Sequence, residues 1–165
     1  MGKRRRISKR EMKRLVENYG RDVLQSESFL SSDSQRQHFH TSVAKHSKQV
    51  AFKTLRICRM MSAIGVKVDE KTAVRAALCH DLGLVGKDQK YNNDMDSLRS
   101  HPAESLRIAQ NIYPGMDSRM EQAILRHMWP ITFRFPSSPE GLAVSVADKL
   151  TSAADIISGI KRKGS

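Results

Sequence analysis

A long apolar face with helical spacing is the feature that most constrains the fold of this chain. Between residues 41 and 65, the side chains that recur at intervals of three, four or seven are Val43, His46, Val50, Ile57, Met61 and Ile64. These intervals predict one face of a helix of about 23 residues. Thr41 or Ser42 is a suitable N-cap, and Gly65 ends the pattern. A buried helix that carries His46 on its apolar face must supply that imidazole with a polar partner.

Five further segments have helical patterns, and no segment has a convincing strand pattern. They are residues 8–26 with a break or bend near Gly20, 70–81 capped by Asp69, 100–115 with Pro102 in the first turn, 117–130, and 137–159. The last helix has an apolar stripe formed by Ala143, Val146, Ala147, Leu150, Ala154 and Ile157. Residues 31–40 are expected to be a polar connector and residues 83–100 a long polar loop, which suits a functional lid or wall. The sequence predicts an all-α, single-domain helical bundle.

The positive charge is concentrated at the two ends of the chain. The 165 residues have a formal net charge of +12, but residues 1–10 hold six Lys/Arg and residues 161–165 hold three. We therefore expect a helical domain over residues 11–160 between two basic tails. Such tails are usually solvated, so binding of nucleic acid through them is conceivable but not favoured. The oligomeric state stays open.

No apolar stretch approaches the ~18–20 residues that a membrane span needs. The basic start "MGKRRRISKR" is followed by "EMKRLVENYG" rather than by the apolar block of a secretory signal. We expect a cytoplasmic protein without a membrane partner.

Six side chains of the kind that bind metals are spread over the predicted helices. They are His46, His80 and Asp81 after the run "AALC", His101, His127 and Asp148. Each one alone has an ordinary explanation, because a single inward histidine is usually a satisfied core residue. Together they favour a divalent cation, because buried polar groups need partners and imidazole and carboxylate are common ligands.

The local phrases around these residues resemble the HD-domain superfamily of metal-dependent phosphohydrolases, over roughly residues 36–155. "KHSKQVA", "ALCHDLG" and "SVADKL" are similar to its three core motifs, and "SHPAES" and "LRHMWP" to the two extra histidine segments of its two-metal branch. The chain also resembles a group of short, single-domain bacterial HD proteins. That group often has His-Gly before the first ligand helix, where this chain has His38-Phe39 and then His40, so we treat both histidines as loop residues.

The resemblance implies a ligand set and a reaction. His46, His80, Asp81 and Asp148 would bind a first cation, and Asp81 would bridge to a second one held by His101 and His127. One or two ions of Fe, Mn, Co, Ni, Zn or Mg are expected, and a version with a single metal stays open. The implied reaction is hydrolysis of a phosphomonoester or a phosphodiester/anhydride, in a nucleotide or another small phosphorylated molecule. The alternative is a non-catalytic module that binds metal and nucleotide.

Phosphate also needs cationic side chains near the metal ligands. Lys149 directly follows a ligand, and we assign it with Asp81 to the catalytic residues. The candidate substrate-binding residues are Lys87, Arg99, Arg126 and Arg134. Any one of these five cations, Lys149 included, is more often a solvated surface residue, so we expect one or two of them to face the site.

Overall fold

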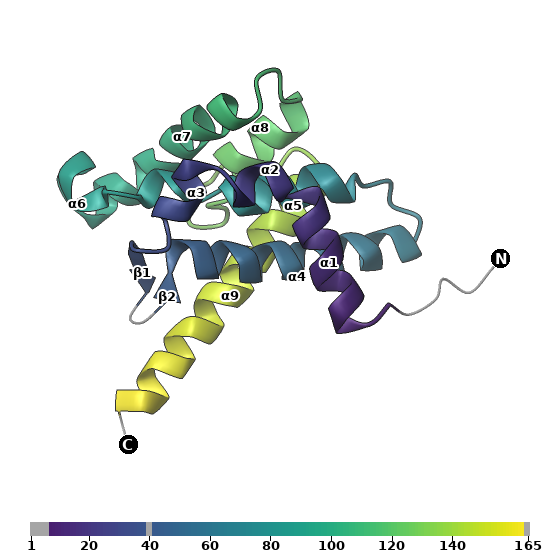
Figure 1. Ribbon diagram of the computed structural model, residues 1–165, viewed down its shortest axis with the longest axis horizontal. Helices are drawn as coiled ribbons and strands as arrows, with labels where there is room; N and C mark the ends of the chain where they lie inside the picture. The colour runs from purple at the N-terminus through teal and green to yellow at the C-terminus, as the bar shows by residue number, and fades with distance from the viewer. Residues whose placement is uncertain (1–6, 39–40, 164–165) are drawn as a thin grey trace.

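The computed structural model describes residues 7–38 and 41–163, and helices form most of this part of the chain (Figure 1). In chain order the elements are α1 (Lys9–Tyr19), α2 (Arg21–Leu24), α3 (Glu27–Ser31), β1 (Arg36–His38), β2 (Thr41–Ser42), α4 (Val43–Ala63), α5 (Glu70–Cys79), the 3-10 turn η1 (Leu82–Leu84), α6 (Lys87–Lys90), α7 (Asp94–Ile112), α8 (Ser118–Leu125) and α9 (Pro139–Lys163). The predicted all-α fold is confirmed. The two strands form only a short antiparallel hairpin.

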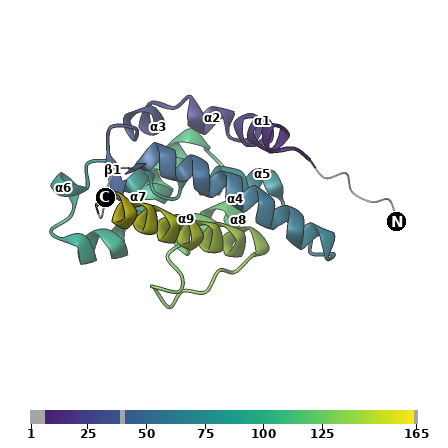
Figure 2. The same ribbon diagram turned by 90° about the horizontal axis from the view of Figure 1, so that it is seen from below.

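Helix α4 runs through the middle of the molecule and packs on two of the long helices, whereas α7 packs mainly on η1 and α8. Helices α5 and α9 lie against α4, while α8 contacts both α5 and α9 (Figures 1 and 2). Helix α5 is almost wholly buried and rich in alanine, which lets its neighbours approach closely. The core between these helices includes Val50, Leu55, Val74, Leu78 and Ile124, all with no exposed surface. No helix of the described residues is long and apolar enough to span a bilayer.

Side-chain caps fix where several helices begin. Ser42 accepts a hydrogen bond from the Lys45 amide, and Asp69 accepts from the amides of Lys71 and Thr72. These two residues were predicted as caps, and each such contact stabilises a helix by about 1 kcal/mol. Helix α1 begins at Lys9 with a capping box, so Lys9 and Arg10 belong to the first helix rather than to a tail. At the other end, α9 continues to Lys163.

The prediction of a long polar loop over residues 83–100 is wrong. This segment contains η1, α6 and the first turns of α7, which starts after the N-cap Asn93. The Asn93 side chain accepts from the Asp96 amide, and acidic residues in the first turn favour the positive end of the helix dipole. Pro102 therefore lies inside α7 rather than in its first turn.

Three other boundaries also differ from the sequence prediction. Part of the expected connector at residues 31–40 forms α3 and β1, which contains His38, whereas His40 lies outside the described residues. Helix α8 ends at Leu125, before the predicted end at residue 130. The predicted apolar face of α4 ends early, because Ile64 is 82% exposed. In α9 the buried face is offset from the predicted stripe, because Leu150 is 55% exposed whereas the neighbouring Thr151 is buried. The C-terminal half of α9 extends away from the body, which leaves that part of its stripe uncovered (Figure 1).

A close backbone approach at Gly83 joins η1 to α7. The Gly83 amide donates to Ser105 Oγ at 2.9 Å, and Tyr91 Oη donates to the Gly83 carbonyl at 2.9 Å. A Cβ atom on Gly83 would lie 2.4 Å from the carbonyl oxygen of His101, which real contacts do not allow. Glycine at this position therefore lets the chain just after the His80-Asp81 pair lie directly against the turn of α7 that carries His101.

Candidate metal centre

All six predicted ligands converge in the interior of the helical bundle. Asp81 is shared by two groups whose ligand atoms lie within 4.8 Å of one another, His46–His80–Asp81–Asp148 and Asp81–His101–His127. None of the six is more than 5% exposed. They come from α4, the end of α5, α7, the turn after α8, and α9. Chain segments a hundred residues apart in sequence thus supply one compact cluster of imidazoles and carboxylates.

The first group surrounds the carboxylates of Asp81 and Asp148. His46 Nε2 lies 3.0 Å from Asp148 Oδ1 and 3.8 Å from Asp81 Oδ2. His80 Nε2 lies 3.1 Å from Asp81 Oδ2 and 3.6 Å from Asp148 Oδ1. Four protein ligands therefore face one point.

The second group uses the other oxygen of Asp81. Asp81 Oδ1 lies 3.3 Å from His101 Nε2 and 3.5 Å from His127 Nε2. The two histidine Nε2 atoms are 3.0 Å apart. This group has three protein ligands, one fewer than the first, which leaves positions for a water or a substrate on a bound cation.

Backbone carbonyls set the tautomer of three of the histidines. Nδ1 of His80, His101 and His127 lies 2.7, 2.7 and 2.6 Å from the carbonyl oxygens of Ala77, Ser97 and Ile124. A carbonyl oxygen only accepts, so each Nδ1 carries a proton and each Nε2 faces the centre, where it offers a lone pair whenever the ring is neutral.

This arrangement fits a divalent cation. His80 Nε2 is buried and lies 3.1 Å from Asp81 Oδ2, in a contact without hydrogen-bond geometry. The Nε2 atoms of His101 and His127 face each other, and two lone pairs at that distance repel unless a proton or a cation lies between them. A pair of cations that share Asp81 would satisfy every one of these atoms, and mixed imidazole and carboxylate ligands suit Fe, Mn, Co, Ni or Zn.

The metal-free cluster has strongly shifted pKa values. Burial alone would lower the pKa of His80, but Asp81 and Asp148 together raise it to about 10. Burial lowers the pKa of His127 to about 4. Burial would raise the pKa of both carboxyls, yet the histidines around them hold the pKa of Asp81 and that of Asp148 well below the usual range. At neutral pH the protein without metal therefore keeps a proton on His80 between two carboxylates.

We expect cation binding near neutral pH to release this proton. A ligand nitrogen must lose its proton to bind a metal, and His80 holds one up to about pH 10. The test is calorimetric titration with Mn²⁺ at pH 7 in two buffers of different ionisation enthalpy. Release of one proton should make the two apparent binding enthalpies differ by about the difference between the ionisation enthalpies of the two buffers. Equal apparent enthalpies would contradict a protonated His80.

The same shift has a consequence for stability without metal. The pKa of His80 in the folded protein lies above its unfolded value of about 6.5, so the protonated side chain stabilises the fold below that pH. This contribution is lost as the pH rises from about 6.5 towards 10.

Asp155 contacts the ligand cluster, and the sequence analysis missed it. Its Oδ2 lies 3.3 Å from His46 Nδ1, so it holds the ring on the side opposite to Asp148. His46 thus differs from the other three histidines, because a carboxylate rather than a carbonyl faces its Nδ1. Such a carboxylate fixes the tautomer of a ligand histidine and raises its basicity. Asp155 follows Asp148 by seven residues, two helical turns along the same face of α9, and this spacing was the signal that could have found it.

We expect Asp155→Asn to weaken cation binding at the first group by ~10-fold or more, because an amide lacks the negative charge that backs His46. Competition with a metal indicator dye measures the affinity. The matched control is Asp96→Asn, an acidic residue of α7 outside both ligand groups. Equal affinity of Asp155→Asn and the unchanged protein would show that the contact does not support the ligand.

Lys149, predicted as a catalytic residue, lies at the edge of the cluster. Its ammonium donates to Asp148 Oδ2 and, at 3.1 Å, to the carbonyl oxygen of His127. The side chain is 26% exposed, so it can contact both the ligand shell and an incoming anion. The contact to His127 also ties α9 to the chain after α8.

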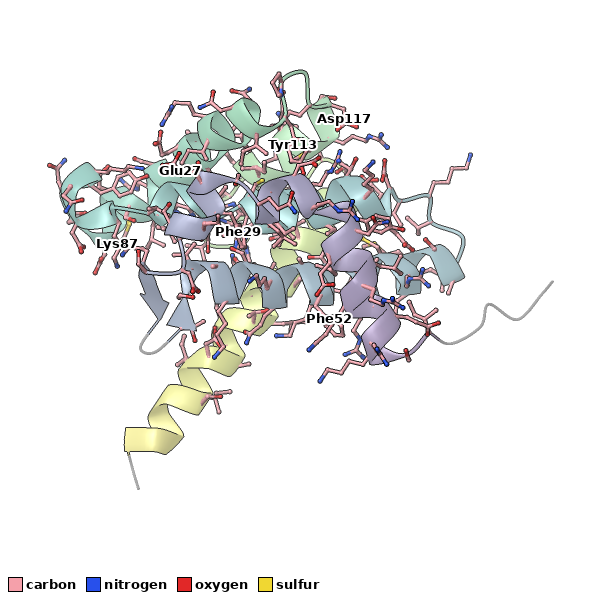
Figure 3. The ribbon with its side chains drawn as sticks, viewed as in Figure 1. Glu27, Phe29, Phe52, Lys87, Tyr113 and Asp117 are labelled. Carbon is pink, nitrogen blue, oxygen red and sulfur yellow. The ribbon has the colours of Figure 1, made fainter. Side chains whose placement is uncertain are left out.

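The four candidate substrate-binding cations lie outside the ligand cluster, and no ion pair joins any of them to a ligand among the described side chains. Arg126 donates to the Phe135 carbonyl at 3.0 Å and so holds the loop after α8. Arg99 and Arg134 line one hollow of about 320 Å³, which none of the six ligands lines. Lys87 lies in α6, at one end of the molecule (Figure 3).

The helical bundle and its buried histidine–aspartate cluster define a class of helical protein whose interior could hold divalent cations. The family model of the HD domain matches residues 43–153, about two thirds of the chain, and the protein belongs to the HD-domain family. No curated protein and no solved structure matched the chain. The family match begins with α4 and ends within α9, so it contains all six ligands.

Proposed function

We propose that this protein is a metal-dependent phosphohydrolase that cleaves a phosphomonoester or a phosphodiester/anhydride bond in a nucleotide or another small phosphorylated molecule. HD-domain proteins are typically metal-dependent hydrolases. The observation that carries the proposal is the sharing of Asp81 between a group of four ligands and a group of three. A purely structural site is usually closed by four protein ligands, whereas the three-ligand group leaves room for a reactant.

The chain's own residues would divide the work in a simple way. His46, His80, Asp81 and Asp148 would hold one cation, and Asp81, His101 and His127 the other. When bound, such cations lower the pKa of water and neutralise negative charge that builds on a phosphoryl group. The backbone carbonyls behind three of the histidines keep their Nε2 lone pairs directed at the centre, so the ligands need no rearrangement.

Lys149 is the cation best placed to meet the phosphoryl group of the substrate. It is partly exposed and already lies beside a ligand carboxylate, whereas the other candidate cations form no ion pair with a ligand among the described residues. Arg99 and Arg134 suit a second anionic group of the substrate, and Arg126 would act indirectly by holding the loop that carries Arg134. Lys87 stays a candidate without a contact that supports it.

The experiment is a phosphate-release screen over nucleotides and sugar phosphates, after metal removal and reloading with Mn, Fe, Co, Ni, Zn or Mg. Lys149→Met should keep the bound metal and lose ~10²-fold or more in kcat, because a charge-stabilising contact at the reacting group is removed. Exposed Lys67→Met is the matched control. If the loaded protein binds nucleotides but releases no phosphate with any metal, it is a non-catalytic binding module and the proposal is wrong.

A further inference from the structure

A groove rich in lysine and arginine runs where α1 crosses α4, on a part of the molecule that the metal centre does not use. One hollow of about 630 Å³ is lined by five lysines, Lys9, Lys13, Lys45, Lys48 and Lys53. A second, of about 1110 Å³, continues along α4 past Arg56 and Arg59. The two hollows share Lys9 and Phe52, so we treat them as one surface and call it the basic groove.

Most of the cations of the basic groove have no carboxylate partner among the described residues. Lys9, Lys13, Lys45 and Arg56 form no ion pair there, although elsewhere on the surface acids pair with Arg75, Arg107 and Arg119. In the groove, Arg59 pairs with Glu70 at 3.5 Å, and Lys53 donates to Thr151 Oγ1 at 2.9 Å. Two acids also line the groove, Glu17 in the first hollow and Glu11 in the second, so its cations outnumber its acids by seven to two. A concavity with this excess of positive charge attracts anions and indicates an anionic partner.

The spacing of the charges favours a chain of anions over a single phosphate. On α4 the cations Lys45, Lys48, Arg56 and Arg59 follow one side of the helix, and together they span roughly 20 Å at 1.5 Å per residue. Lys9 and Lys13 border the same groove from α1, one turn apart. A lone phosphate would occupy a small fraction of hollows of this volume, whereas a phosphodiester backbone presents a charge at every step along such a track.

An aromatic ring lies in the middle of this track. Phe52 is half-buried, lies between the two hollows, and is seen at the lower edge of α4 beside α1 (Figure 3). Cationic grooves that follow a backbone, with aromatic rings on which bases stack, are the usual means of binding single-stranded nucleic acid. We propose that the basic groove binds single-stranded nucleic acid, as a site separate from the metal centre and independent of the proposed hydrolase activity.

The test measures binding of a fluorescently labelled 12-nucleotide oligouridylate to the full chain by anisotropy, over a series of salt concentrations. In Lys9→Glu/Lys13→Glu we expect binding at low salt to weaken by ~10-fold or more, with a salt dependence reduced by about two counterions. The matched control, Lys67→Glu/Lys71→Glu, makes the same change in net charge on exposed lysines outside the groove. It should bind within about two-fold of the unchanged protein.

Phe52→Leu separates stacking from charge, because it keeps an apolar side chain and removes the ring. We expect it to weaken binding by at least ~5-fold while circular dichroism stays unchanged. The proposal is overturned if the two lysine variants weaken binding equally, since net charge or the terminal basic residues would then be responsible. It is also overturned if poly-L-glutamate competes as well as the oligonucleotide and Phe52→Leu has no effect, which would identify an acidic peptide as the partner.

Discussion

Replacing Asp81 with alanine should abolish both cation sites in a single step. Asp81 is the one residue common to the two ligand groups, with one oxygen facing His80 and the other facing His101 and His127. Without it, the first group keeps three ligands and the second keeps two histidines. We expect the metal content to fall from about two ions per chain to near zero, and kcat to fall by at least ~10³-fold.

Metal analysis of the purified protein by mass spectrometry is the direct measurement for Asp81→Ala. Asp88→Ala, in α6 and outside both groups, is the matched control and should keep both metal and activity. Asp81→Asn distinguishes loss of charge from loss of volume, because it keeps the size of the side chain. A variant without Asp81 that still carries two ions would show that the shared carboxylate is not the bridge.

The second prediction uses His127→Ala and Asp148→Ala to distinguish a site with two cations from a site with one. In His127→Ala the first group is complete, so we expect about one ion per chain, together with a loss in kcat of ~10²-fold or more because the three-ligand site is gone. In Asp148→Ala the first group is broken, and both metal content and activity should fall. Each variant therefore keeps one complete ligand group, Asp81–His101–His127 in Asp148→Ala and His46–His80–Asp81–Asp148 in His127→Ala, and we expect each to hold about one ion per chain and to lose turnover.

Activity that survives in His101→Ala and His127→Ala but is lost in Asp148→Ala would show that one cation is enough for the reaction. Circular dichroism checks the fold of each variant, because His127 is fully buried and its removal leaves a cavity. His127→Gln, which fills more of that volume, serves as the second variant if the alanine variant does not fold.

The six candidate ligands could be picked out from the sequence because they are polar residues within, or at the ends of, apolar helical patterns. His46 and Asp148 interrupt apolar faces of long helices, and the His80-Asp81 pair ends an alanine-rich buried helix. The N-caps Ser42 and Asp69 could be predicted in the same way. A short polar side chain just before an apolar helical pattern accepts a hydrogen bond from a backbone amide of the first turn.

The first turns of α7 could not be predicted because two local signals competed. Pro102 is typical of a first turn, and it outweighed Asn93 followed by Asp94 and Asp96, which is the true start. The prediction of a buried stripe at the C-terminal end of α9 was wrong for a different reason. Its apolar stripe continues past Ser152, but whether another helix covers that stripe depends on where the body of the molecule ends, which periodicity does not encode.

Contacts between side chains of helices that are distant in sequence could not be predicted either. The placement of the candidate substrate-binding arginines depends on which side of α7 and of the loop after α8 they occupy, and nothing local in the sequence fixes that. Arg126 illustrates this point, because its guanidinium is used to hold the Phe135 carbonyl.

The shared Asp81 has a mechanical consequence. The first ligand group comes from α4, α5 and α9, which pack closely on one another, whereas His101 and His127 come from α7 and the turn after α8. A second cation would therefore add a link from α7 and the turn after α8 to the segments that supply the first group. Hydrogen exchange in α7 should slow when the second cation is bound. The concentration of available metal would then control how often this helix opens as well as the rate of the proposed reaction.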